Sequence, residues 1–146
     1  MRAWPYLFLL IVFSCSTYAE EELEGFDNQI KSYVKDKKLT FSKTEEGVYY
    51  NIKQIGTGRK IIYSDSVLIS YKGVLLDGTL VDEQQKPIWF AVKDLIAGWK
   101  HTLTLINKNS VIELIIPPQL GYGDHKLQKI PKNSILFYEV KVVDIH

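Results

Sequence analysis

The sequence predicts an α+β fold, in which an antiparallel β-sheet of about five or six strands is crossed by one short helix. After Leu39, apolar and polar residues alternate along several segments, which is the period of a half-buried strand. Helical spacing occurs in that body only between Leu95 and Ile106. The chain has 146 residues, 46% of them hydrophobic, which suits one globular domain with little left over.

An N-terminal amphipathic helix is predicted from Glu21 to Lys38, ahead of the sheet. Its apolar residues recur at helical spacing: Leu23, Phe26, Ile30, Tyr33 and Val34. A single stripe this short is weak evidence for a coiled coil. We therefore interpret residues 20–38 as a helical spacer that covers an apolar patch or separates the domain from a tether, with dimerisation as the alternative.

The first half of the sheet is predicted from alternating runs at residues 48–53 and 67–76. The first run ends in a turn at Gly56-Thr57-Gly58, and the second ends at Asp77-Gly78, which is a strong hairpin signal. A further strand resumes at Leu80, and Pro87 is expected to interrupt it.

The second half of the sheet follows the short helix. Residues 107–110 turn the chain into a strand at 111–116, which Pro117-Pro118 ends. A glycine-rich loop, LGYGD, covers residues 120–124. The last strand is predicted from Ser134 to Ile145, with alternate residues on opposite faces.

Composition and motifs exclude several functional classes. The 18 basic and 17 acidic side chains nearly balance, so nucleic-acid binding is not expected. The three histidines, His101, His125 and His146, do not have metal-ligand spacing, so no metal is expected. The sequence contains no Gly-x-Ser-x-Gly elbow, P-loop, dinucleotide fingerprint or His-Glu-x-x-His motif, and no cofactor is expected.

The N-terminus has the layout of a secretory signal peptide over residues 1–19. Arg2 precedes an apolar run from Trp4 to Phe13, which small and polar residues and then three glutamates follow. The apolar run is shorter than the roughly 20 residues that a membrane-spanning helix needs, so a permanent anchor is the weaker alternative. The pattern therefore predicts export.

Two processing routes are consistent with this leader. Cleavage after Ala19 discards the single cysteine and releases the chain into an oxidising compartment such as the bacterial periplasm. Alternatively, the sequence from Val12 to Cys15 resembles a bacterial lipobox, with Phe13 bulkier than usual, and Cys15 is then the lipidation candidate. Acyl chains on Cys15 would tether the protein to a membrane. The sequence alone leaves both routes open.

Candidate site residues are polar-tipped aromatics and one carboxylate at sheet and loop positions: Tyr71, Asp82, Trp99, Tyr122 and Tyr138. Each aromatic taken alone suits a core position equally, because tyrosine and tryptophan bury large apolar areas. Asp82 alone also suits a turn cap. Their significance therefore depends on their occurring together.

Together they carry a resemblance to a known family. The matching segments are VLISYKGVLLDGTLVD (67–82), LIAGW (95–99), PPQLGYGD (117–124) and IPKNSILFYEV (130–140). In this order and spacing, they resemble the FKBP family of macrolide-binding peptidyl-prolyl isomerases. The resemblance covers residues 39–146, which it identifies as an FKBP-type isomerase domain, and implies a strongly bent sheet wrapped around the short helix.

The resemblance also implies roles for individual residues. The implied catalytic residues are Tyr71, Asp82, Ile96 through its backbone amide, Trp99 as an indole floor, and Tyr122 as a hydroxyl donor. The implied substrate-binding walls are Val81, Ile88, Phe90, Leu95, Ile130 and Tyr138. Val81 and Ile88 stand where the family often has phenylalanine, so slower catalysis and lower macrolide affinity are expected.

The implied activity is peptidyl-prolyl cis-trans isomerisation of proline-containing, unfolded or flexible polypeptides outside the cytoplasm. It would stabilise a twisted prolyl amide without a covalent intermediate. Macrolides are the implied inhibitors. The alternative is a non-catalytic peptide-binding or chaperone module that keeps the same pocket.

Overall fold

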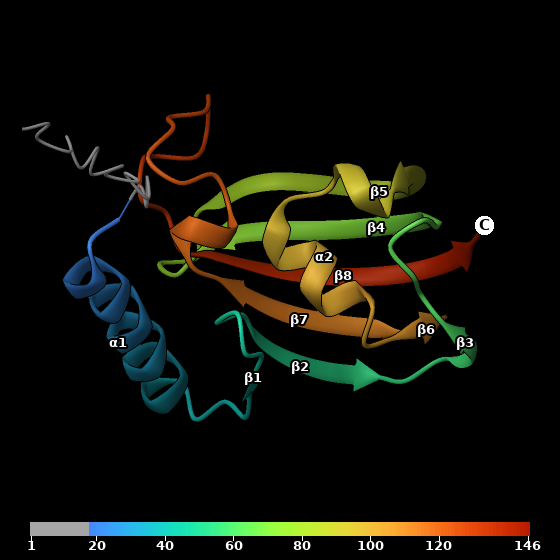
Figure 1. Cartoon of the computed structure of the whole chain (residues 1–146), viewed down its shortest axis with the longest axis horizontal. Coiled ribbons are helices and arrows are strands. Elements are labelled where there is room, and N and C mark those ends of the chain that lie inside the picture. The colour runs from blue at the N-terminus through green and yellow to red at the C-terminus, as the bar shows by residue number, and fades with distance from the viewer. Residues whose placement is uncertain (1–17) are drawn as a thin grey trace, which may run out of the picture.

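The computed structural model describes residues 18–146, so the predicted leader up to Thr17, including Cys15, lies outside the described residues. Within these residues, two α-helices and eight strands follow each other in sequence (Figure 1). Their bounds are α1 Glu20–Asp36, β1 Ser42–Lys43, β2 Tyr49–Gln54, β3 Thr57–Lys60, β4 Ser66–Leu75, β5 Leu80–Ala91, α2 Ala97–Leu103, β6 Asn107–Lys108, β7 Val111–Ile116 and β8 Leu136–Ile145. Among the described residues, no helix is long and apolar enough to cross a membrane.

Six strands form one antiparallel sheet in the order β1-β2-β7-β8-β4-β5, which confirms the predicted α+β class. The C-terminal strand β8 lies in the centre, between β7 and β4. A second sheet pairs β3 with β6, where the sequence predicted only a turn at 56–58. That pairing joins segments about 50 residues apart, so local alternation does not reveal it.

The prediction that Pro87 interrupts a strand is wrong, because β5 is continuous from Leu80 to Ala91. Its register against β4 shifts between Gln84 and Ile88, so the extra residues form a bulge that contains the proline. β5 is also one of the two edge strands of the six-stranded sheet, the other being β1. Proline is tolerated at such a place because no second neighbour needs its missing N–H.

Helix α2 packs on one face of the sheet and forms the main core with it (Figure 1). Trp99 and Leu103 of the helix are buried with Leu114 of β7 and Val140 of β8. A Cβ atom at Gly98 would lie 2.6 Å from the Ile116 side chain. The absent side chain therefore allows the helix to approach β7 closely.

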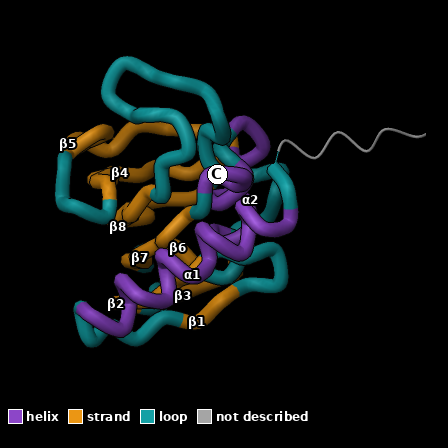
Figure 2. The backbone as a smooth tube through the Cα atoms, turned by 90° about the vertical axis from the view of Figure 1, so that its left-hand side faces the viewer, coloured by secondary structure: helices purple, strands orange, loops and turns teal. Residues whose placement is uncertain are grey.

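Helix α1 covers a smaller apolar cluster at the end of the sheet, across β7 and β2 (Figure 2). Ile30 is fully buried there with Tyr49 of β2 and Ile115 of β7. Because strand side chains alternate between faces, Ile115 points away from the core that Leu114 enters. The helix thus packs against the domain and does not project from it.

Candidate active site

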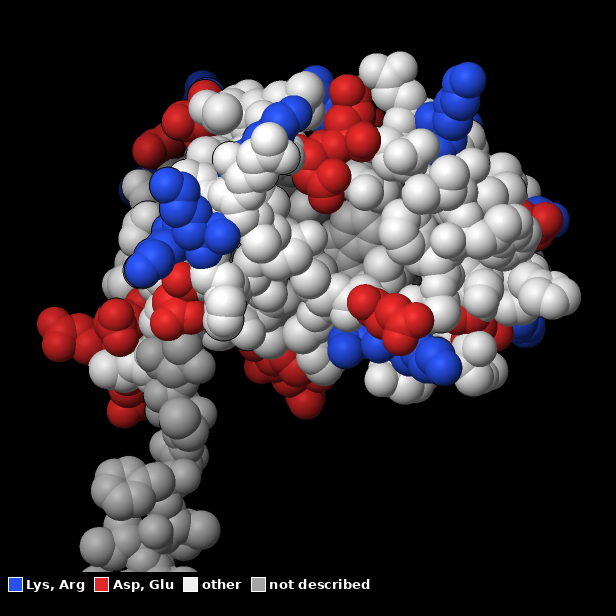
Figure 3. Space-filling model, turned by 90° about the horizontal axis from the view of Figure 1, so that it is seen from above, with Lys and Arg blue, Asp and Glu red and all other residues white. Residues whose placement is uncertain are grey.

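A cavity of about 250 Å³ lies between the sheet and the segment that leads into α2. Its lining brings together side chains from β4, β5, α2, β8 and two loops: Tyr71, Asp82, Phe90, Asp94, Leu95, Ile96, Trp99, Tyr122 and Tyr138. Figure 3 shows a hollow on this side of the molecule, with acidic side chains at its rim. The lining contains two carboxylates and no lysine or arginine.

The floor of the cavity is an aromatic cluster centred on Trp99. Its ring centroid lies 5.0 Å from that of Tyr71 and 5.0 Å from that of Tyr138, both in edge-to-face geometry. Phe90 lies 6.2 Å from Tyr71 and extends the aromatic surface. Trp99 is only 4% exposed, and its indole N–H has no acceptor among the described residues. The floor is therefore a buried aromatic surface whose indole N–H is unpaired among the described residues.

One carboxylate is held in the wall by a tyrosine from the central strand. The Tyr138 hydroxyl donates a hydrogen bond to Oδ2 of Asp82, at 3.1 Å. Gly73 of β4 pairs with both residues, so it lies between them in the sheet. A Cβ atom at Gly73 would lie 2.3 Å from the Tyr138 ring. Because Gly73 has no side chain, the Tyr138 ring has the space that it needs to reach Asp82.

Burial and the Asp82 carboxylate keep the tyrosine hydroxyls of the cavity protonated. Burial first, and then the charge of Asp82, raise the pKa of Tyr71 to about 12. The same two causes raise the pKa of Tyr122. Burial raises the pKa of Tyr138 further, because this side chain is the most enclosed of the three. All three hydroxyls are thus neutral donors at physiological pH.

A backbone donor lies at the entrance to α2. The Ile96 carbonyl accepts hydrogen bonds from the amides of Trp99 and Lys100, at 3.1 and 3.2 Å, and so begins the helix. The Ile96 amide itself has no backbone acceptor within residues 18–146. Ile96 is one of the residues that line the cavity, as is Trp99 of the floor.

All five residues implied as catalytic line this cavity, as do three of the six implied walls, Phe90, Leu95 and Tyr138. The other three, Val81, Ile88 and Ile130, are not among the residues that line it, and their role as walls stays a prediction. Val81 and Ile130 are buried in the main core. Ile88 is 41% exposed on the edge strand, beside the bulge that contains Pro87.

Asp94 lines the cavity but was not predicted from the sequence. It lies in a short 3-10 turn, Val92–Asp94, directly before the LIAGW segment. Its position next to that segment was the available signal. A single acidic residue at the start of a helical pattern is usually assigned to a helix terminus. Asp94 was therefore not considered as a cavity residue.

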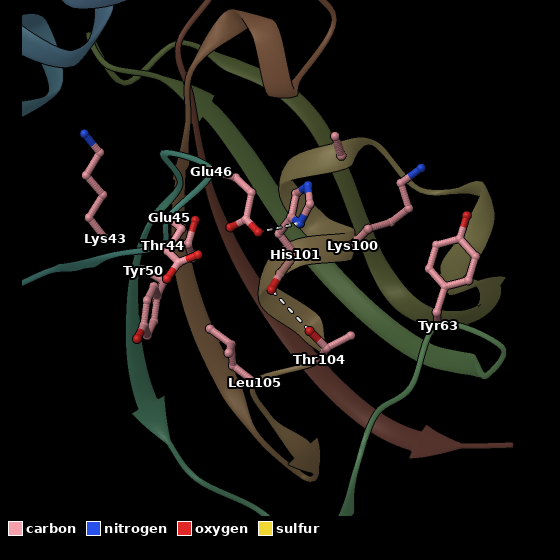
Figure 4. Close-up of a pocket in the computed structure, with 11 residues that line it drawn as sticks. Lys43, Thr44, Glu45, Glu46, Tyr50, Tyr63, Lys100, His101, Thr104 and Leu105 are labelled. Carbon is pink, nitrogen blue, oxygen red and sulfur yellow. Dashed lines mark hydrogen bonds and ion pairs between the residues drawn. The ribbon is translucent and has the colours of Figure 1, made fainter.

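A larger cavity of about 760 Å³ lies along the face of α2 that carries Lys100, His101 and Thr104 (Figure 4). Glu46 points toward His101 across it, with 3.4 Å between Oε1 and Nδ1. Its other polar side chains come mainly from the exposed β1–β2 turn. None of the predicted site residues lines it, and it has no enclosed aromatic floor. The smaller cavity is therefore the better candidate.

Comparisons with known proteins agree with this geometry. The family model for the FKBP-type peptidyl-prolyl cis-trans isomerase matches residues 57–143. FkpA of Buchnera aphidicola subsp. Schizaphis graminum is 42% identical over 108 residues, which cover 71% of this chain and 43% of that relative. FkpA of Escherichia coli strain K12 is 34% identical over 139 residues, which cover 89% of this chain and 51% of that relative. The chain spans about half the length of these curated relatives.

Solved structures show the same fold. The crystal structure of FkpA from Escherichia coli aligns with a TM-score of 0.74 at 30% identity, covering 86% of this chain and 62% of that chain. The structure of AtFKBP13 aligns with a TM-score of 0.67 at 25% identity, covering 72% of this chain and 98% of that chain. With the family model matching more than half of its length, the chain belongs to the family of FKBP-type peptidyl-prolyl cis-trans isomerases.

Proposed function

We propose that this chain is a peptidyl-prolyl cis-trans isomerase that acts on proline-containing, unfolded or flexible polypeptides. The observation that carries the proposal is the cavity itself. Its support is that three residues line one small space: Trp99, Tyr122 with its neutral hydroxyl, and Ile96, whose backbone N–H has no backbone acceptor among the described residues. These groups suit a proline ring and the carbonyls beside it.

The reaction needs no nucleophile, metal or cofactor. Rotation about a prolyl amide passes through a twisted state in which resonance is lost, and the barrier is about 18–20 kcal/mol. A twisted amide is less dipolar than a planar one, so it loses less hydration on entering an apolar cavity. Each tenfold acceleration requires only about 1.4 kcal/mol of preference for the twisted state.

We assign a separate role in isomerisation to each group of lining residues. Trp99, Tyr71 and Phe90 enclose the proline ring and exclude water. The Ile96 N–H and the Tyr122 hydroxyl hold carbonyls of the bound chain, so that only one side of the bond turns. Asp82 sets the local charge beside the reacting amide.

Exchange of a proline peptide between cis and trans tests the proposal directly. We expect the purified chain to accelerate exchange, and the double variant Tyr122→Phe with Asp82→Val to lose most of this acceleration. Tyr63→Phe is the matched control, because Tyr63 is 57% exposed and lines only the larger cavity. Peptide binding without any acceleration would support the alternative, a non-catalytic peptide-binding or chaperone module.

Macrolide binding is a second part of the proposal. Macrolide inhibitors of this family would occupy the same aromatic cavity and compete with the peptide. Val81 and Ile88 are smaller than the phenylalanine that the family often has at these positions, so we expect a lower macrolide affinity. Titration of the exchange assay with a macrolide measures the affinity, and inhibition that peptide does not relieve contradicts a shared site.

We further propose that the chain is exported, with Cys15 as the lipidated first residue of the mature protein. The support comes from Tyr18, which cleavage after Ala19 would remove. Its hydroxyl donates to Oδ1 of Asn133 at 2.8 Å, and its ring packs edge-on against Phe26 at 5.3 Å. Tyr18 is 6% exposed, so it is part of the folded domain.

The intact mass of the mature protein tests this route. An acylated N-terminal Cys15 supports the proposed tether. A free N-terminus at Glu20 rejects it and leaves a protein without a lipid anchor, for which the bacterial periplasm is the proposed location.

A further inference from the structure

A second cavity, of about 400 Å³, adjoins the candidate active site. Tyr122 belongs to the lining of both cavities, so one side chain separates them. The second cavity is otherwise lined by the start of α1 and by the loop that carries Tyr122. None of the residues that the family resemblance implies, apart from Tyr122, contributes to it.

The two walls of this second cavity are fixed relative to each other. The hydroxyl of Tyr18, which precedes α1, donates to the Asn133 side chain. The backbone N–H of Asn133 donates to the Gly123 carbonyl at 2.9 Å. The Gly123 amide in turn donates to the Pro118 carbonyl at 2.9 Å. This series of hydrogen bonds connects α1 to the loop on the far side. The cavity is therefore a formed feature and does not depend on loop closure.

The chemistry of the lining favours an apolar side chain. Leu23 of α1, the buried Pro118 and the Tyr122 ring supply apolar surface. Asp124 and His125 are exposed at the rim, where their side chains lie 3.2 Å apart. An apolar group can thus be buried while the backbone that carries it stays in water.

We propose that this second cavity receives an apolar side chain of the same polypeptide whose proline occupies the active site. The inference rests on the proposed isomerase function, and Leu23 is its specificity-determining residue. The continuity through Tyr122 argues for this occupant, because a polypeptide bound in the first cavity can reach the second by passing this one side chain. An extended chain rises about 3.3 Å per residue, so it crosses one side chain within about two or three residues.

Pairs of peptides that differ at one position test the proposal. Each pair contains one proline and carries either leucine or serine two or three residues away, on one side or the other. For the wild-type chain we expect kcat/KM for exchange to favour leucine on the order of tenfold in at least one pair. In Leu23→Ser we expect the leucine-to-serine ratio to fall to about one. Leu23→Trp, which fills the cavity, should abolish the preference in the same way.

Leu39→Ser is the matched control, because Leu39 follows α1, is 37% exposed and lines neither cavity. It should keep the wild-type ratio. A wild-type ratio of one in every pair, or a preference that persists in both Leu23 variants, overturns the inference. If the wild-type chain accelerates no peptide, the isomerase function fails instead, and the same ratios measured as peptide Kd values then decide the second cavity separately.

Discussion

The Tyr138 hydroxyl and the Asp82 carboxylate meet at 3.1 Å across the position of Gly73, and they connect the central strand β8 to the edge strand β5. This contact fixes a negative charge in the wall of the cavity. It also explains why burial and charge act together on the neighbouring tyrosines, because the carboxylate that Tyr138 holds faces Tyr71 and Tyr122.

Tyr138→Phe removes this hydrogen bond and keeps the aromatic ring. We expect the free energy of unfolding to fall by about 1–2 kcal/mol, since a half-buried carboxylate loses its donor. We also expect kcat/KM for prolyl exchange to fall several-fold, because Asp82 is no longer held in the wall. Urea unfolding and the exchange assay measure the two effects. Unchanged values in both would show that the hydrogen bond contributes nothing.

Gly73→Ala tests whether the space beside Tyr138 is required. The new Cβ would lie 2.3 Å from the ring, so the ring must move, at a cost of about 1–3 kcal/mol in unfolding free energy. Gly25→Ala is the matched control, because nothing lies within 4 Å of a Cβ there and the residue is inside α1. We expect that control to stabilise the protein by about 0.5–1 kcal/mol. Equal effects of the two substitutions would contradict a steric role for Gly73.

This relationship also marks the limit of what the sequence predicts. The alternating runs and the family motifs predict the sheet, α2 and eight of the nine lining residues of the cavity. The position of Gly73 between Asp82 and Tyr138 depends on the register of three strands, and local patterns do not contain that register.

The three implied wall residues outside the lining lie where local patterns say least about position. Ile88 follows the bulge at Pro87, and Val81 lies where the β4–β5 register shifts again, so the direction of either side chain depends on that register. Ile130 lies in a long loop and is nevertheless buried in the main core. The β3–β6 pairing was missed because both strands are short and distant in sequence.

The acid stability of the domain should depend on Asp27 in α1. Its carboxylate contacts the Lys31 and Lys43 ammonium groups, at 2.7 and 2.6 Å, and accepts from the Tyr49 hydroxyl at 2.8 Å. Burial opposes these contacts, but their sum lowers the pKa of Asp27 from 3.8 to about 2. A depressed folded-state pKa gives stability that is present above the unfolded value and is lost as the pH falls toward 2.

Asp27→Asn should therefore cost about 1 kcal/mol of unfolding free energy near pH 7, after discounting for solvent screening of the exposed lysines. The difference from wild type should shrink between pH 4 and pH 2. Urea unfolding across this range measures it. Asp36→Asn, at an exposed position at the end of the same helix, is the matched control and should cost less unfolding free energy near pH 7 than Asp27→Asn.

The cavity tyrosines should resist ionisation at alkaline pH. Burial and the Asp82 charge raise the pKa of Tyr71 from 10.0 to about 12, so its hydroxyl stays protonated where an exposed tyrosine ionises. The folded domain then loses stability as the pH rises from about 10 toward 12, because unfolding frees the group to ionise.

Tyrosinate absorbance tests this prediction. Between pH 9 and about 11, Tyr71→Phe should remove almost none of the absorbance that develops in the folded protein, but one tyrosine's share of the absorbance that develops in the urea-unfolded protein. Equal losses in the folded and the unfolded protein would mean that Tyr71 is not shielded.

Substitution of Trp99 should lower the isomerase activity strongly, and substitution of Trp89 should leave it unchanged. The Trp99 indole packs edge-on against Tyr71 and Tyr138, and each such aromatic pair contributes about 0.5–1.5 kcal/mol. Trp99→Phe leaves a smaller ring on the floor, so the cavity widens and holds the proline ring less closely. We expect kcat/KM for exchange to fall about tenfold, which corresponds to about 1.4 kcal/mol. Trp89→Phe is the control, because Trp89 is 49% exposed on the edge strand and lines neither cavity.

Tryptophan fluorescence of the same two variants shows whether the peptide binds next to Trp99. In Trp89→Phe, the buried Trp99 dominates the emission, and adding a proline peptide should change it, because the indole lines the occupied cavity. In Trp99→Phe, measured on protein without the leader that carries Trp4, the remaining emission comes from the exposed Trp89 and should not respond to peptide. A peptide response that persists without Trp99 would place the binding site away from this cavity. This result would contradict the proposed mechanism, in which the proline ring packs on Trp99.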